Sequence, residues 1–156
     1  LFEPRTWNDK TATASPNSKR ITFKNLEQLA TFFKRPELLI DGHPRRIILS
    51  EQGFHSDGKP DGDTAQAAAY CYAWVKVNRL GGIDSFILHR HVDHSGEGGL
   101  NLGLWRREPD SVATPSTPRP MYDVFLKADT PEWETAFKFA LPVIGIKSWD
   151  DIFKRR

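Results

Sequence analysis

An isolated carboxylate follows an apolar run in the first half of the chain. Ile47, Ile48 and Leu49 precede Glu51, and Gly53 follows it. Residues that are apolar at consecutive positions predict a strand buried on both faces, as in a parallel sheet. A charged side chain is expected only where such a strand emerges, at its carboxyl end, which is where α/β proteins bind ligands. Glu51 is therefore a candidate nucleophile, general base or metal ligand.

A second group of polar side chains comes after another apolar run. If that segment continues a strand, alternation places His89, His91 and Asp93 on one face. Two histidines and an aspartate can ligate zinc or divalent iron, so a metal-dependent hydrolase that uses these three residues is one hypothesis. Polar residues at a strand end also form hydrogen bonds to a sugar or to a catalytic carboxylate. Arg90 is a candidate partner for Glu51, because a neighbouring guanidinium keeps a carboxylate ionised.

The remaining candidates lie in loops. Glu97 is a second carboxylate, but its glycine-rich loop is a poor platform for acid catalysis. Trp7 and Trp105 lie among polar and glycine residues, where aromatic rings can grip flat ligands; packing in a core is the alternative for both. His55 and Asn8 are weaker candidates near the same predicted edge.

These candidates need a scaffold, and hydrophobic periodicity predicts one. Residues 65–78 have the apolar spacing of a helix that ends at Gly81, and a second apolar run at 83–88 predicts a strand. Strand, helix and strand form a βαβ unit with a right-handed crossover, so both strand ends lie at one edge of a parallel sheet. Asp63 or Thr64 is expected to cap the helix. Elsewhere the sequence predicts a helix at 23–33 after a Thr22 cap, helices at 121–127 and 131–140, a strand at 144–147, a helical turn at 148–151, a loop at 1–20, and a loop at 95–120 with a short extended piece at 100–105.

Size and composition place the chain among ordinary globular proteins. Its 156 residues suffice for one domain, and 38% are hydrophobic and 27% charged. The net charge is +2 without a long basic block, so nucleic acid is not an expected partner. No apolar run approaches the roughly 20 residues of a membrane span, Cys71 is the only cysteine, and no nucleotide-binding motif occurs. We expect neither a membrane partner nor a cofactor.

The stretch around Glu51 resembles a known motif. In retaining glycoside hydrolases with (β/α)8 barrels, a similar sequence closes the seventh strand, and its glutamate is the catalytic nucleophile. More of the chain resembles an uncharacterised bacterial family, domain of unknown function 5722, which is grouped with those barrels. That resemblance rests on Trp7-Asn8-Asp9, Leu49-Ser50-Glu51-Gln52-Gly53-Phe54, Gln66-Ala67-Ala68-Ala69-Tyr70, His89-Arg90-His91-Val92-Asp93-His94 and Gly103-Leu104-Trp105, in this order.

The resemblance implies an α/β fold that is part of a (β/α)8 TIM barrel. Residues 1–156 would form a single C-terminal barrel fragment containing roughly the last two to three βα units. The implied function is retaining hydrolysis of a polysaccharide or glycan by a secreted or periplasmic protein, with Glu51 as nucleophile. Gln52 stands where many barrel glycosidases have Phe or Tyr, so the substrate class stays open. The resemblance implies that Arg90, His91 and Asp93 line the sugar pocket, with Trp7 or Trp105 as stacking platforms. Asn8 and His55 join these predicted carbohydrate-binding residues because of their position near the same edge.

Part of the expected machinery is missing from this chain. A complete barrel needs about 250 residues, and a retaining enzyme needs a second carboxyl group roughly 5 Å from the nucleophile. In the superfamily the acid/base glutamate lies on the fourth strand, which this chain lacks. We therefore expect a piece of a longer protein that is inactive alone, with its open sheet edge covered by another fragment, another chain or self-association. A non-catalytic carbohydrate-binding module or pseudo-enzyme is the alternative function.

Overall fold

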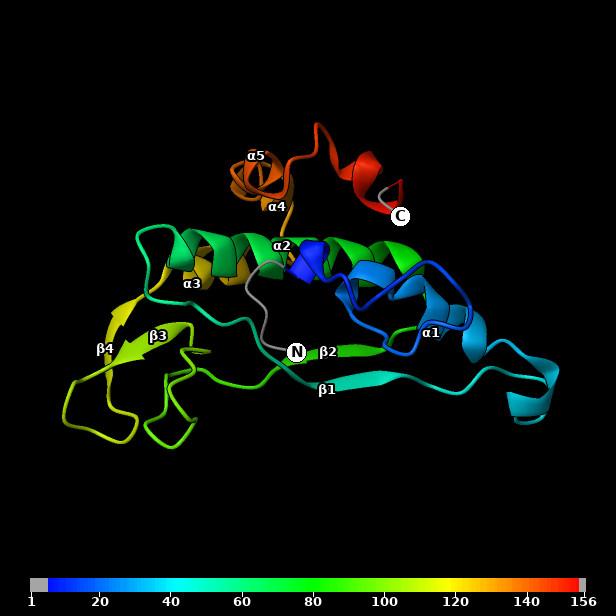
Figure 1. The fold of residues 1–156 in the computed structure, drawn as a ribbon, viewed down its shortest axis with the longest axis horizontal. Coiled ribbons are helices and arrows are strands. Elements are labelled where there is room, and N and C mark those ends of the chain that lie inside the picture. The colour runs from blue at the N-terminus through cyan, green and yellow to red at the C-terminus, as the bar shows by residue number, and fades with distance from the viewer. Residues whose placement is uncertain (1–5, 155–156) are drawn as a thin grey trace.

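The computed structural model describes residues 6–154 and has a mixed α/β fold (Figure 1). At its centre are a strand, a long helix and a second strand: β1 (Ile48–Gln52), α2 (Gly62–Leu80) and β2 (Ser85–Leu88). β1 and β2 pair in parallel, so the predicted βαβ unit is confirmed. Within residues 6–154 this sheet has two strands, and it forms no closed barrel.

The two faces of the parallel sheet differ in what covers them. Leu49 and Phe86 pack against the core to which α2 contributes. On the other face Ile48 is 57% exposed and Ile87 is 48% exposed. The prediction that the strand of Glu51 is buried on both faces is therefore wrong, because no element within the described range covers the second face.

Helix α2 is buried on nearly all sides, which explains its run of small side chains. The consecutive alanines Ala67, Ala68 and Ala69 are 0% exposed. Figure 1 shows the helix between the β1–β2 sheet and α5 (Ala140–Ile144). It begins at Gly62 after Asp61, earlier than the predicted cap, and Gly81 ends it as expected, with a φ of 63° that favours glycine.

The N-terminal third flanks this unit with short helical turns. Thr22 caps the first of them as predicted, because its Oγ1 accepts a hydrogen bond from the Lys24 backbone at 3.2 Å. The Asn25 side chain in turn accepts from the Thr22 backbone, and the predicted helix at 23–33 becomes a 3-10 turn followed by an α-helix. Residues 1–5 of the predicted N-terminal loop lie outside the described residues. The elements are η1 (Thr6–Asn8), η2 (Phe23–Asn25), α1 (Glu27–Phe32) and η3 (Pro36–Leu38).

The region predicted as a loop at 95–120 contains an antiparallel hairpin. β3 (Trp105–Arg107) pairs with β4 (Pro115–Pro118). The extended piece predicted at 100–105 overlaps β3 only at Trp105. No apolar alternation marks either strand, and β4 tolerates its prolines because it is an edge strand.

The C-terminal segment packs on α2 with short helices. α3 (Pro120–Lys127) agrees with the predicted helix, whereas the helix predicted at 131–140 is divided into α4 (Trp133–Ala136) and α5 (Ala140–Ile144). The strand predicted at 144–147 is wrong, because Gly145 adopts a left-handed conformation and ends α5. η4 (Trp149–Phe153) follows the predicted cap at Ser148. None of the helices between residues 6 and 154 combines the length and apolar character that crossing a lipid bilayer requires.

Candidate functional site

Polar side chains gather where β1 and β2 end, at the carboxyl edge of the parallel sheet. Glu51 is the penultimate residue of β1, and His89 comes directly after β2. The backbone N–H of His89 donates a hydrogen bond to the Gln52 carbonyl at 2.8 Å. The two candidate segments therefore lie side by side, as parallel pairing of their strands requires.

The side chain of Glu51 is exposed at this edge. An irregularity between Leu49 and Gln52 gives β1 one more residue than β2 over the same stretch. Leu49 and Gln52 both line one groove, so Glu51 does not share the face of Leu49, where strict alternation would put it. Among the described residues, none pairs with the Glu51 carboxylate. Arg90, its expected partner, pairs with Glu97 instead.

Glu97 anchors the segment that follows β2. Nε of Arg90 donates to its Oε1 at 2.7 Å, a second Arg90 nitrogen contacts the same oxygen, and Nε2 of His89 lies 3.3 Å from it. The hydrogen bond from Arg90, with that from His89, outweighs burial and lowers the pKa of Glu97. Glu97 therefore stays ionised at neutral pH. It is suited to holding Arg90 and His89 at the sheet edge and is unsuited to donating a proton.

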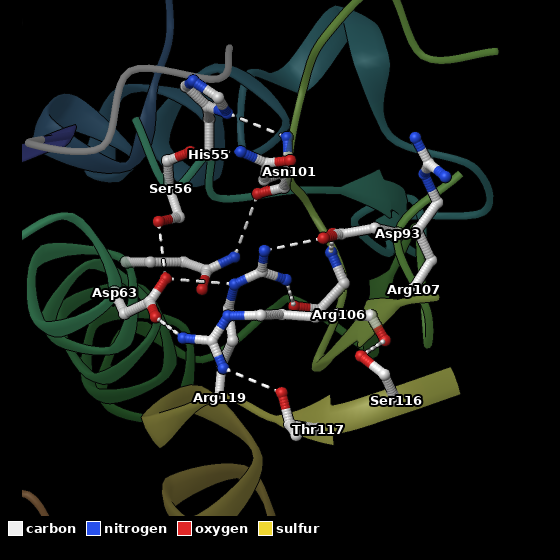
Figure 2. Close-up of polar contacts among 12 residues, drawn as sticks. His55, Ser56, Asp63, Asp93, Asn101, Arg106, Arg107, Ser116, Thr117 and Arg119 are labelled. Atoms are coloured by element: carbon white, nitrogen blue, oxygen red, sulfur yellow. Dashed lines mark hydrogen bonds and ion pairs between the residues drawn. The ribbon is translucent and has the colours of Figure 1, made fainter. Parts of the chain in front are cut away.

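A buried ion-pair network, formed by Asp63, Asp93 and Arg119, lies beside this edge (Figure 2). Nη2 of Arg119 donates to Asp93 at 2.6 Å, and its Nε donates to Asp63 at 3.0 Å. The side chains of Arg119 and Asp93 are only 4% and 7% exposed. Asp63 also pairs with Arg106 and accepts a hydrogen bond from Ser56 at 2.6 Å.

The buried ion-pair network joins three segments that are distant in sequence. Asp63 lies in the first turn of α2, Asp93 follows β2, and Arg119 immediately precedes α3. Gly103 fits between them: its N–H donates to Asp93 at 2.8 Å and its carbonyl accepts from Arg119 at 3.2 Å. A Cβ at Gly103 would lie 2.4 Å from the Asp93 nitrogen, so only glycine fits there. The network thus fixes the polar segment after β2 against the helix.

The charge of Asp63 is maintained by its neighbours. Burial acts to raise its pKa, but the hydrogen bond from Ser56 and the charges of Arg119 and Arg106 outweigh burial and lower it. The ionised carboxylate of Asp63 therefore faces the guanidinium groups of Arg119 and Arg106. A buried arrangement of this kind is stable only while each charge keeps its partner.

The two loop tryptophans occupy different environments. Trp7 is 4% exposed and packs in the core, with its ring centroid 6.2 Å from that of Tyr72. Trp105 is partly buried, and its ring meets the ring of Tyr122 edge-on at 5.3 Å. The indole nitrogen of Trp105 has no hydrogen-bond acceptor within the described part of the chain. Of the two rings, Trp105 has more surface available for a ligand.

The polar candidate residues also differ in their burial and in their hydrogen bonds. Asn8 and His91 are exposed, and Nδ1 of His55 accepts a hydrogen bond from the Asn101 backbone at 3.0 Å. Asp93 belongs to the buried ion-pair network, where both of its oxygens already accept hydrogen bonds. The structure brings His89, Arg90 and Glu97 together after β2, next to the end of β1, and it directs Asp93 inward.

Nearly the whole chain matches one known family. Residues 1–152 match the Family of unknown function (DUF5722). The chain belongs to this family. The family resemblance drawn from the sequence motifs is thereby confirmed. Comparison of this DUF5722 chain with curated proteins and with solved structures gives no match.

The metal hypothesis finds no support in the geometry of the DUF5722 chain. Between residues 6 and 154, no group of three or more His, Cys, Asp or Glu side chains could hold an ion. His89 lies against Glu97, and Asp93 pairs with Arg119. His89, His91 and Asp93 therefore do not converge as a ligand set.

Sequence reasoning did not identify Arg119 or Arg106 as members of a site. It predicts Asp63 only as a possible helix cap, whereas the structure makes Asp63 the shared anion of both arginines. The one available signal is the position of Arg119 between Pro118 and Pro120, directly before an apolar helix. That pattern marks a constrained arginine but does not indicate its partners.

Proposed function

We propose that this DUF5722 chain is the C-terminal part of a glycoside-hydrolase-like (β/α)8 barrel that acts on a polysaccharide or glycan, with Glu51 as the nucleophile. The observation that carries this proposal is the uncovered face of the β1–β2 sheet. In such a barrel each strand has helices outside, and its other face points into an interior filled with branched aliphatic side chains. Ile48 and Ile87, 57% and 48% exposed, have the character and the position of such interior residues.

The edges of this short sheet also favour additional strands. A groove of about 310 Å³ lies beside β1 and is lined by Leu26, Leu29 and Leu49. A second groove of about 390 Å³ lies beside β2. Exposed strand edges with unfilled grooves next to them are features of an incomplete sheet. Two to three βα units taken from a barrel would have both.

The environment of Glu51 suits a nucleophile at the carboxyl edge. Its carboxylate is exposed, and no residue between 6 and 154 pairs with it, so it is free to meet a substrate. Arg90 lies at the end of the neighbouring strand, held by Glu97, where its remaining N–H groups can donate to sugar hydroxyls. His91 and Trp105 are further proposed contacts for the sugar.

The acid/base group has to come from outside the described residues. Retaining hydrolysis requires a protonated carboxyl group roughly 5 Å from the nucleophile. Glu97 does not meet this requirement, because Arg90 and His89 lower its pKa. We therefore expect the isolated chain to be inactive and the strands that complete the barrel to supply the proton donor.

A second candidate function is carbohydrate binding without catalysis. It is favoured by the same observation about Glu97, since this second carboxylate pairs with Arg90 and is unsuited to act as an acid. The two candidates differ in one measurable respect. A binding module retains glycan affinity and releases no product, whereas the enzyme releases a sugar with retained anomeric configuration.

The decisive experiment replaces Glu51 in the longest natural protein that contains this chain. On a panel of glycans, Glu51→Gln should lower kcat by at least about 10³-fold and change Kd little, because it removes an interaction needed only during the reaction. Sodium azide should restore turnover to Glu51→Gly, because the small anion can occupy the space of the missing carboxylate.

The control variant is Glu134→Gln, a change of the same kind at an exposed residue of α4. It should retain wild-type turnover. Undiminished turnover by Glu51→Gln, on a substrate that the wild type cleaves, would exclude Glu51 as the nucleophile. Glycan binding by the wild type without any cleavage would favour the binding module.

A further inference from the structure

A groove of about 390 Å³ lies beside β2, toward its amino end and away from Glu51. It is lined by Ser85 and Phe86 of β2 and by residues of α2 and α3, and no residue of β1 contributes to it. β1 is the one described strand that pairs with β2. The groove therefore adjoins the strand edge whose backbone hydrogen-bonding groups have no neighbouring strand in the described part of the chain.

The walls of the groove are aromatic. The rings of Tyr70 and Phe86 stack with an interplanar angle of 17° and centroids 5.8 Å apart. Phe125 of α3 lies 5.9 Å from Tyr70 and is 41% exposed. Faces of such rings carry partial negative charge and attract cations.

Two carboxylates give the groove a negative charge. Asp129 accepts a hydrogen bond from Trp74 Nε1 at 3.2 Å, and no described lysine or arginine pairs with it. Asp84 is partly compensated by Arg46, 3.3 Å away. The residues that line the groove include no lysine or arginine. In agreement with the negative charge of the groove, burial and the charge of Asp129 raise the pKa of the Tyr70 hydroxyl.

We propose that the free edge of β2 accepts an extended segment of a partner polypeptide that places a lysine or arginine opposite Phe86. Residues opposite each other on paired strands point to the same face, and Phe86 points toward α2 and α3. A long basic side chain at that position enters the groove, lies against the aromatic rings and reaches Asp129. Charge complementarity therefore specifies the residue, and the free edge supplies the backbone hydrogen bonds.

This docking edge is separate from the chemistry proposed for Glu51, because it lies at the other end of the strand. If the barrel proposal is correct, the partner is the strand that follows β2 around the barrel, and that strand carries the basic residue. If Glu51 is not a nucleophile, the docking edge is unaffected. A test that uses no glycan therefore distinguishes the failure of one proposal from the failure of the other.

The test uses this chain and three probes, followed by NMR. The first probe is the blocked peptide acetyl-Val-Thr-Lys-Thr-Val-amide, whose valines and lysine share one face when it is extended. The second has glutamate in place of lysine, and the third is Nα-acetyl-lysine amide. The lysine peptide should shift the amide signals of Ser85–Leu88 and the indole N–H of Trp74. It should bind at least about fivefold more tightly than either other probe.

A matched pair of variants tests whether peptide binding requires the negative charge of Asp129. Asp129→Asn keeps an oxygen that can accept from Trp74, and it should reduce affinity for the lysine peptide to that of the glutamate peptide. Asp110→Asn, the same change at an exposed residue outside the groove, should leave affinity unchanged. Equal binding of the two peptides, or no shift in β2, would overturn the proposal. Acetyl-lysine amide that binds as tightly as the peptide would also overturn it, because the groove would then be a small-cation site.

Discussion

The uncovered β1–β2 face and the buried ion-pair network lie in neighbouring parts of one chain but differ in how completely their groups are satisfied. In the network, Arg119 is 4% exposed and pairs with two carboxylates, and the oxygens of Asp93 are also bound. On the sheet, Ile48 and Ile87 are about half exposed. One region has its partners within the chain, whereas the other has apolar surface that a partner can cover.

This difference implies that the two regions have different roles, one in the stability of the fold and the other in association with a partner. A buried charge is tolerated only where its partner is already present, so the network has to be complete in the chain itself. Exposed aliphatic side chains are compatible with a folded monomer, but when they lie together on a sheet they favour association. We therefore expect substitutions in the network to change the free energy of unfolding, and substitutions on the sheet face to change association.

The largest expected effect is that of Arg119→Met. It leaves Asp93 buried without its cation and should lower the free energy of unfolding by about 3–5 kcal/mol, measured by urea denaturation. Arg45→Met is the control, because Arg45 is exposed and donates to the Leu38 carbonyl at 3.2 Å; it should change stability by less than about 0.5 kcal/mol. A loss below about 1 kcal/mol for Arg119→Met would remove the contrast between the two regions.

A fall in pH is expected to have a smaller effect on the free energy of unfolding. The pKa of Asp63 in the folded state lies below the value of 3.8 expected for the unfolded state. At pH values between these two pKa values the unfolded state binds more protons than the folded state, so the free energy of unfolding rises with pH. The contribution of Asp63 is present above about pH 4 and is lost as the pH falls through the folded-state pKa. Urea denaturation at several pH values between about 2 and 5 should show that the free energy of unfolding depends less steeply on pH in Asp63→Asn than in Asp110→Asn. Equal slopes would mean that Asp63 does not link stability to pH.

The smallest effect on stability is expected on the uncovered face. Ile87→Thr should change the free energy of unfolding by less than about 0.5 kcal/mol, because the side chain is already half exposed. The same substitution should reduce self-association in sedimentation velocity. Leu49→Thr, on the face that packs against the core, should cost about 1.5–3 kcal/mol. If the two variants lost equal stability, the proposed difference between the faces would be wrong.

The parts of the fold that were predictable from the sequence depend on local signals. The apolar runs and the spacing at 65–78 predict β1, α2 and β2, and Thr22 and Gly81 act as the cap and the stop that their chemistry favours. The carboxyl edge was predictable for the same reason, because parallel pairing brings Glu51 and His89 together whatever the loops do.

The parts that were not predictable depend on turns and side-chain pairings that hydrophobic periodicity does not record. β3 and β4 have no alternation, and they form a hairpin in which Trp105 pairs with Pro118 and Arg107 pairs with Pro115. Ile144 and Ile146 have the composition of a strand, but Gly145 turns the chain there. The pairing of Arg90 with Glu97, and of Arg119 with Asp93, follows from loop geometry that no periodicity records.

The burial of α2 on several sides bears on the order in which the chain is made. One side of this helix contacts η1 and η2, which precede it in the chain, but the side that contacts α3 and α5 is covered only by residues synthesised later. On the ribosome, the nascent helix therefore carries a bare apolar surface until the C-terminal helices emerge. During that interval the apolar surface of α2 is the part of the nascent chain that a chaperone would bind.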